Sequence, residues 1–188
     1  MSKIGVKPII IKEGVTVQKE GGNILAKGSL GEVKVVVPAN IKVEIEDGQI
    51  RVTRLKEDKK TRSCHGTIAR LITNAIIGTS SGFEKNLEVV GTGFRGQMEG
   101  EVLVLTLGFS HPVRFDPPTG IKISMVENKI KVAGANKEVV GLIAARIKKI
   151  KEPDAYKGKG IHYEGEKLKL KPGKVVAKAG VAGGTGGK

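Results

Sequence analysis

Alternation of apolar and polar residues predicts that the first part of the chain is built from short strands. β-Branched runs separated by glycine occur at residues 8–11, 14–17 and 34–37, and residues 41–45 alternate with period two. Asp47-Gly48 is a tight-turn dipeptide, after which the alternation resumes in residues 49–53. We therefore expect a β-hairpin at this point.

The apolar period changes to that of a helix between residues 65 and 77. One stripe at helical spacing should pack on one face of the sheet, and its members are Ile68, Leu71, Ile72, Ala75 and Ile76. The charged residues 56–62 are interpreted as a loop, and Gly78 is expected to end the helix.

Residues 83–152 repeat this plan. A shift of 80 positions superimposes residues 41–43 on 121–123 and 50–52 on 130–132, and a second helix follows with Val140, Ile143 and Ile147 in its core. Such a repeat predicts an α+β protein of two tandem, internally duplicated domains, each a mostly antiparallel sheet packed against one helix. The pattern leaves open whether the other face of each sheet is solvated, paired with the sister domain or curled on itself.

We place the first domain at residues 1–82, as a supporting domain, and the second at residues 83–152. A basic extension follows over residues 153–188, with eight lysines against three acidic residues. Its closing residues 179–188, rich in Gly and Ala, are expected to be disordered.

Composition favours a polyanionic partner. The net charge is +14 and the pI is 9.9, which points to nucleic acid first and an acidic membrane second. Only four Phe, two Tyr and no Trp are present, so recognition of folded RNA through phosphates and shape fits better than base stacking on an aromatic platform.

Other features narrow the class of protein. The longest apolar run, residues 102–107, is far shorter than the ~20 residues that span a bilayer, and the N-terminus has no apolar signal core. A single cysteine, Cys64, excludes an intrachain disulfide and fits a reducing compartment, so we expect a cytoplasmic protein.

The extension opens with a candidate nucleic-acid-binding loop. Lys157 and Lys159 alternate with Gly158 and Gly160, and Tyr156 precedes them. Glycine would let the backbone approach a partner, lysine would reach phosphate and tyrosine would stack. A flexible surface turn with solvated lysines explains the same composition.

A second basic run follows at residues 167–171. Lys167, Lys169 and Lys171 alternate with leucines, as in an edge strand whose outward face is lysine. Protection of that edge against aggregation is the alternative to RNA contact.

No catalytic, cofactor or metal site is expected. Residues 91–96 satisfy the glycine pattern of dinucleotide-binding folds, but a strand-like run follows where that mechanism needs a helix. A glycine loop with Arg95 reaching phosphate and a simple hairpin turn both stay open. Three scattered histidines and one cysteine give no zinc pattern.

Several motifs agree, in order, with one known family: residues 1–5, 82–85, 91–95 and 107–113, and above all the loop at 153–161. Through them the chain resembles the bacterial sixth large-subunit ribosomal protein (L-six, the universal uL-six family) from residue 1 to about 175. It departs from the family at His162, where Arg is usual, and at Cys64, where Leu is usual.

The resemblance implies a non-enzymatic structural constituent of the large ribosomal subunit, located on the ribosome in the cytoplasm. It implies binding to 23S rRNA near the stalk base and the sarcin–ricin and factor-binding region, through the C-terminal domain and extension. Neighbouring large-subunit proteins would be partners and translation factors would dock nearby, with no membrane or small-molecule substrate. The rival interpretation is a basic protein-interaction scaffold with generic RNA affinity.

The candidate RNA-binding residues combine the matching motifs with the basic extension. They are Phe94, Arg95, Ser110, His111, Tyr156, Lys157, Gly158, Lys159, Gly160, His162, Lys167, Lys169, Lys171, Lys174 and Lys178.

Overall fold

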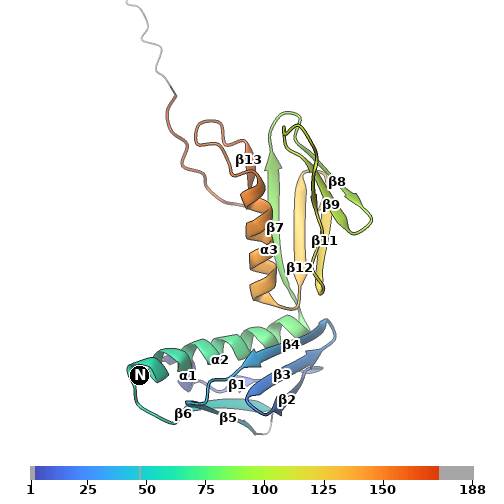
Figure 1. Cartoon of the computed structure of the whole chain (residues 1–188). Coiled ribbons are helices and arrows are strands. Elements are labelled where there is room, and N and C mark those ends of the chain that lie inside the picture. Colours follow the sequence, from blue (N-terminus) through green and yellow to red (C-terminus); the bar gives the residue numbers. More distant parts are fainter. Residues whose placement is uncertain (1–2, 47, 174–188) are drawn as a thin grey trace, which may run out of the picture.

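The first half of the chain forms two three-stranded antiparallel sheets around one long helix (Figure 1). The structure is a computed structural model that describes residues 3–46 and 48–173. The elements of this half are α1 (Lys3–Val6), β1 (Ile9–Ile10), β2 (Thr16–Glu20), β3 (Asn23–Gly28), β4 (Gly31–Val36), β5 (Ile41–Glu46), β6 (Gln49–Arg54) and α2 (Lys59–Ser80). The sheet orders are β1-β6-β5 and β2-β3-β4.

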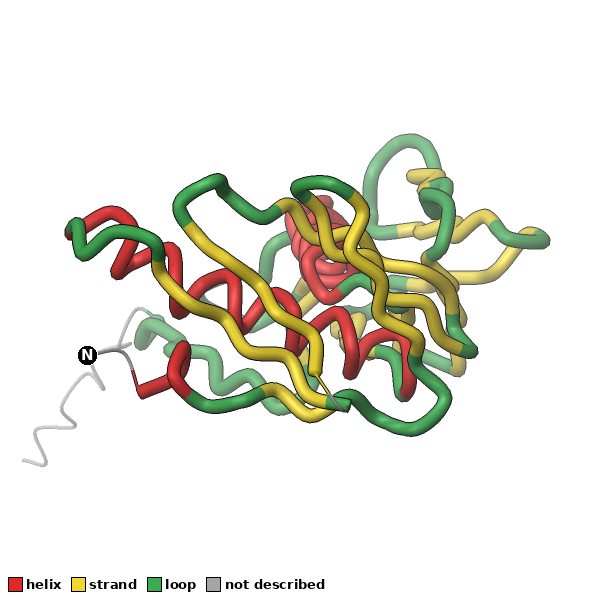
Figure 2. The backbone as a smooth tube through the Cα atoms, turned by 90° about the horizontal axis from the view of Figure 1, so that it is seen from below, coloured by secondary structure: helices red, strands yellow, loops and turns green. Residues whose placement is uncertain are grey.

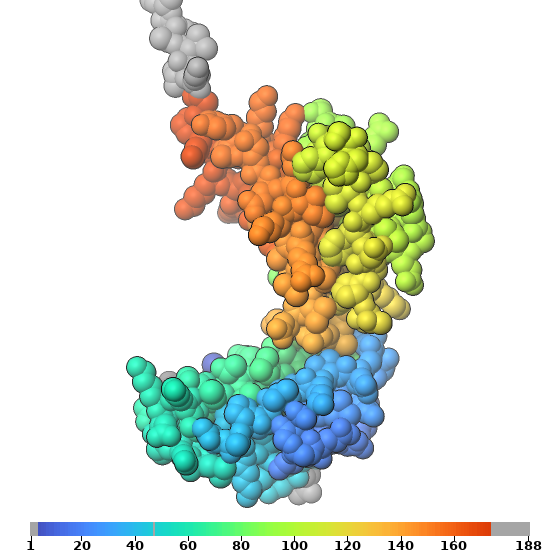
Figure 3. All heavy atoms as spheres, in the orientation of Figure 1, coloured from blue at the N-terminus to red at the C-terminus, as the bar shows by residue number. Residues whose placement is uncertain are grey.

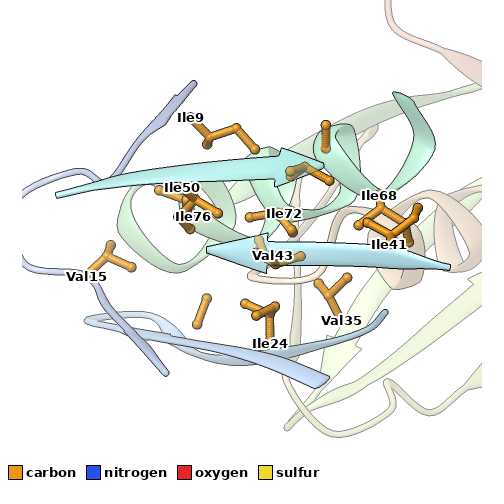
Figure 4. Close-up of a cluster of buried hydrophobic side chains, with 14 residues drawn as sticks. Ile9, Val15, Ile24, Val35, Ile41, Val43, Ile50, Ile68, Ile72 and Ile76 are labelled. Atoms are coloured by element: carbon orange, nitrogen blue, oxygen red, sulfur yellow. The ribbon is translucent and has the colours of Figure 1, made fainter. Parts of the chain in front are cut away.

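Both sheets and α2 bury side chains in one shared core (Figure 4). Ile24 of β3, Val43 of β5 and Ile72 of α2 are among its most buried residues. The alternating residues of the predicted hairpin pair antiparallel from Ile41 with Arg54 to Glu46 with Gln49, as expected. The second sheet supplies the rest of this core. The other face of the hairpin sheet, which the sequence left open, is solvated, because Lys42 of β5 and Arg51 and Thr53 of β6 are exposed. Seen from below, strands of this half lie across α2 (Figure 2).

Helix α2 differs from its prediction at both ends. It begins at Lys59, inside the segment interpreted as a loop, and continues past Gly78 to Ser80. Gly78 is buried, and a Cβ there would lie 1.9 Å from the carbonyl oxygen of Ala135. The glycine thus permits close contact with the second half instead of ending the helix. Leu71, expected in the core, is 38% exposed.

The second half repeats the architecture with one added strand. Its elements are β7 (Phe83–Val90), β8 (Arg95–Glu99), β9 (Val102–Thr106), β10 (Val113–Phe115), β11 (Ile121–Val126), β12 (Lys129–Gly134), α3 (Lys137–Ile150) and β13 (Gly160–Tyr163). The sheet orders are β11-β12-β7-β13 and β10-β9-β8. β11 and β12 keep the 80-residue offset from β5 and β6, so the predicted α+β class with tandem duplication is confirmed.

The added strand comes from the basic extension. β13 pairs antiparallel with β7, with Ile161 opposite Val89, so that β7 lies between β12 and β13. The Ile161 side chain is fully buried in the second core beside Val140, Ile143 and Ile147. The sequence did not predict this strand.

The two halves give the molecule a curved outline (Figure 3). Helices α2 and α3 both lie on the concave side, and the two halves meet where α2 ends and α3 begins (Figure 1). Ser81 and Gly82 close α2 by donating backbone hydrogen bonds to Ile77 and Gly78, and Gly82 adopts a φ of +74° before the chain enters β7. The end of α3 and the extension lie at the far tip of the second half.

Candidate nucleic-acid interface

Three loops that are far apart in the sequence meet at the tip of the second half. They are residues 91–94 after β7, residues 107–112 after β9, and residues 151–159 after α3. The Lys159 ammonium donates a hydrogen bond to the Thr92 hydroxyl at 2.6 Å. The Lys151 ammonium lies 4.7 Å from the ring centroid of Phe109 and 6.0 Å from that of Phe94, within the range of cation–π attraction. We call this surface, together with residues 164–171, the loop face.

The predicted lysine–glycine loop has a fixed shape. The Ile161 amide donates to the Lys151 carbonyl at 2.8 Å, and the Asp154 amide donates to the Lys159 carbonyl at 2.9 Å, so the loop closes on itself. The Asp154 carboxylate accepts a hydrogen bond from the Lys157 amide at 3.0 Å. These bonds leave the backbone little freedom, which does not fit the alternative of a flexible turn.

The glycines of this loop serve its own packing. Gly160 is buried with φ of +153°, and a Cβ there would lie 2.6 Å from the Cα of Pro153. Gly158 is also buried, with φ of +69°, and a Cβ there would lie 3.4 Å from the side chain of Leu168. Close approach is therefore made by the protein's own chain, where the sequence suggested approach by a partner.

Two acidic side chains hold the extension against the body of the second half. Glu164 accepts hydrogen bonds from Lys129 at 2.7 Å and from Asn86 at 2.9 Å. Glu166 accepts from Lys148 at 2.7 Å and from the Tyr163 amide at 3.0 Å. The Lys129 and Lys148 hydrogen bonds are the main cause that lowers the pKa of Glu164 and of Glu166, respectively.

Residues 167–171 do not form the predicted edge strand. They run as irregular chain against the loop, where the Lys171 amide donates to the Ala155 carbonyl at 2.8 Å. Leu168 and Leu170 turn toward Gly158, whereas Lys167, Lys169 and Lys171 are exposed. Lys174 and Lys178 lie outside the described residues.

The loop face carries basic side chains that no acid neutralises. In the described part of the chain, ion pairs engage Lys129 and Lys148, but none engages Arg95, Lys151, Lys157, Lys159, Lys167, Lys169 or Lys171. Because Glu164 and Glu166 are occupied by lysines of the body, the lysines of the extension keep their charge available. Such a surface can neutralise several phosphates at once.

The remaining sequence candidates differ in accessibility. Tyr156 is 58% exposed, and Arg95, Ser110 and His111 are exposed. Phe94 is half-buried, with its ring against Gly91 and the second core. The half-buried His162 ring has its Nδ1 3.0 Å from the Tyr163 carbonyl. The loop face thus contains every described candidate except three: Arg95, which is the first residue of β8 directly after the loop at 91–94, and Gly160 and His162, which lie in β13.

Sequence reasoning missed three residues that build the loop face: Thr92, Phe109 and Lys151. Phe109 is 42% exposed, although the chain has only six aromatic side chains of the Phe, Tyr and Trp types. A signal was available for Phe109 and Thr92, since both lie inside motifs that were singled out. Lys151 lies at the end of α3, outside those motifs, and only the folded structure brings it to the two rings.

Other kinds of site find no support in the described residues. Within residues 3–46 and 48–173, no group of three or more His, Cys, Asp and Glu side chains could hold a metal ion. Among the same residues, no helix combines the length and hydrophobicity needed to cross a membrane. Residues 91–94 lead into strand β8 and not into a helix, which agrees with rejecting the dinucleotide-binding pattern. They form a turn that joins β7 of one sheet to β8 of the other, so they are not the hairpin turn that was one of the two alternatives.

Comparisons with known proteins agree along nearly the whole chain. The model of the family described as "Ribosomal protein L6" matches residues 11–82 and again residues 90–164. The large ribosomal subunit protein uL6 of Hydrogenobaculum sp. is 47% identical over 178 residues, which cover 95% of this chain and 98% of the relative. The proteins of the same name from Persephonella marina and Halalkalibacterium halodurans are 45% and 46% identical, over 95% and 93% of this chain and 100% and 98% of their own.

Proposed function

Because the chain belongs to the ribosomal protein L6 family of the large ribosomal subunit, we propose that it binds 23S rRNA through the loop face. The family membership also agrees with the predicted location on the cytoplasmic ribosome. The observation that carries the proposal is the gathering of unpaired cations from residues 151–159 and 164–171, where Lys159 contacts Thr92 and Lys151 contacts Phe109 of the two neighbouring loops.

The chemistry of the loop face suits RNA more than an apolar partner. Lys157, Lys167 and Lys169 are exposed point charges that can contact phosphate, and Tyr156 offers an exposed ring for stacking on a base. The loop backbone is held by its own hydrogen bonds, so little ordering is required when RNA binds. Affinity should therefore come chiefly from phosphate neutralisation and depend strongly on salt.

We further propose the finer points that the resemblance implied. The RNA site is near the stalk base and the sarcin–ricin region, neighbouring large-subunit proteins are partners, and translation factors dock nearby. The first half, over residues 1–82, supports and spaces the second. We propose no enzymatic role, in keeping with a family of ribosomal structural proteins.

The test is filter binding of the full chain to a 23S fragment that carries the sarcin–ricin region, from ~50 to ~200 mM salt. The variant Lys157→Ala/Lys159→Ala should lower the slope of log affinity against log salt by about two units, one for each phosphate contact removed. Thr92→Val serves as the control, because it removes the hydrogen bond of Lys159 but leaves its charge.

The outcomes separate the proposal from its rival. A preference for the 23S fragment over an unrelated folded RNA of equal length, with the reduced slope in the double variant, supports the proposal. An unchanged slope in the double variant excludes these lysines as contacts. Binding to neither RNA at the lowest salt would favour the protein-interaction scaffold.

A further inference from the structure

The two long helices carry most of their charge as cations. α2 has four basic residues and no acidic one, and α3 has four basic residues and a single acid, Glu138. Both helices lie on the concave side of the molecule (Figures 1 and 3). The concave side is therefore lined by two basic helices, one from each half, whose axes run in different directions (Figure 1).

The acids of the described chain are concentrated elsewhere. Strands carry pairs of opposite charge, such as Lys42 with Glu44 at 2.7 Å and Lys131 with Glu84 at 2.6 Å. These neighbouring charges cancel over the strand surfaces. On the helices only Arg62, paired with Glu57 at 3.7 Å, and Lys148, paired with Glu166, find acids among the described residues. Uncompensated positive charge thus collects on the helices.

Three of the unpaired helix cations are accessible to an anion. Arg70 of α2 and Arg146 and Lys149 of α3 are exposed, and none forms an ion pair with a described residue. Lys137, by contrast, lies 5.3 Å from the ring centroid of Phe83. At a rise of 1.5 Å per residue, α2 is ~33 Å and α3 ~21 Å long, enough to follow several phosphates.

The shape of the concave side leaves room for a large partner. On the outward side of α3, Gly141 has no atom within 4 Å of a Cβ position, and Ala145 is exposed. Where the halves meet, a cavity of about 390 Å³ opens between β4, α2 and the start of α3. Its lining includes two basic residues, Lys34 and Lys137, and one acidic residue, Glu138. The open space at Gly141 and this cavity leave room for part of a partner.

We propose that the concave helical face binds a second segment of ribosomal RNA, held by phosphate contacts from both halves. The inference rests on the proposed function, because it takes the partner to be the same 23S rRNA. Charge complementarity selects RNA, and the face is continuous with the loop face through Lys149 and Lys151 at the end of α3. The first half would then contact RNA directly in addition to supporting the second.

The test compares three variants of the full chain on 23S rRNA, over the same salt range and by hydroxyl-radical footprinting. The helix variant is Arg70→Gln/Arg146→Gln/Lys149→Gln. The matched control is Lys19→Gln/Arg51→Gln/Lys122→Gln, which removes the same charge from exposed positions on strands β2, β6 and β11. The third is the loop variant Lys157→Ala/Lys159→Ala. Circular dichroism checks that each remains folded.

We expect the helix variant to lower the salt slope by about three units and to lose one protected RNA segment, while the control changes the slope by less than about one. The loop variant should lose a different protected segment. If the helix variant matches the control while the loop variant weakens binding, this inference is overturned and the proposed function stands. If neither variant differs from the control, both proposals fail.

Discussion

At the scale of single residues, the atoms next to a glycine decide how strongly its position requires glycine. Gly160 and Gly165 both have positive φ values, +153° and +77°. A Cβ at Gly160 would collide with Pro153 and the Glu152 carbonyl, whereas a Cβ at Gly165 would meet nothing within 4 Å. The first position therefore depends on a backbone-to-backbone contact, and the second depends only on its own conformation.

We expect Gly160→Ala to destabilise the second half by about 2–4 kcal/mol, because local strain adds to the collision with Pro153. Gly165→Ala should cost only about 1–2 kcal/mol, the usual penalty for a left-handed conformation. Urea denaturation of each variant measures both values. Equal losses would show that the loop can move away from Pro153.

Residue-scale patterns also explain what the sequence could and could not predict. The hairpin of β5 and β6 was predictable because strict alternation and Asp47-Gly48 encode it locally. The prediction that Gly78 ends the helix was wrong, because glycine at this position permits a close contact with Ala135, which is distant in sequence. The Lys151 cation–π contacts and the Lys159–Thr92 bond are likewise tertiary, so no local pattern contains them. The contribution of the fifteen candidate residues to RNA binding stays a prediction, as do the domain limits at 82 and 152.

At the scale of elements, the extension is held to the second half by carboxylates. The pKa values of Glu164 and Glu166 are lowered by their hydrogen bonds to Lys129 and Lys148. A group whose pKa is lower in the folded state stabilises that state above its unfolded pKa, and this stabilisation is lost as pH falls through the folded value. The attachment of residues 164–171 should therefore weaken in acid.

The Glu166 N–H donates to the Tyr163 carbonyl at 3.0 Å. We expect the protection of this amide against exchange to fall as the pH is lowered from 6 to below ~4.3, the ordinary glutamate pKa. The variant Glu166→Gln should show reduced protection already at pH 6, because the amide cannot pair with the Lys148 charge. Hydrogen exchange, corrected for its intrinsic pH dependence, measures both. Glu101→Gln, at an exposed turn position, is the control, and the same protection in Glu166→Gln and the native chain at pH 6 would contradict the assignment.

At the scale of the whole molecule, one buried glycine sets how closely the two halves meet. Gly78 in α2 and Gly141 in α3 are both helical, but only the first faces another backbone, that of Ala135. The contact lies between the end of α2 and the residues before α3, where the two halves meet (Figure 1). If the concave helical face binds RNA through both halves, the contact between Gly78 and Ala135 fixes the distance between the cations of α2 and those of α3.

We expect Gly78→Ala to destabilise the protein by about 1–3 kcal/mol through overpacking and to change the angle between the halves. Gly141→Ala, with open space around it, should instead stabilise α3 by about 0.5–1 kcal/mol. Denaturant unfolding gives the energies and small-angle X-ray scattering reports the change in shape. A Gly78→Ala protein with native stability and native scattering would rule out this role for the contact.

The return of β13 to β7 has a consequence for how the protein is made. Among the described residues, the buried members of the first core all lie between Ile9 and Ile76, so this core can form while the rest of the chain is still being translated. The second core needs Ile161, which pairs with a strand synthesised at the very start of that half. Until residue 163 has emerged, β7 presents an unpaired edge to its surroundings. A nascent chain therefore completes its second half only after β13 has emerged, and a stop codon before that point leaves the half open to aggregation and proteolysis.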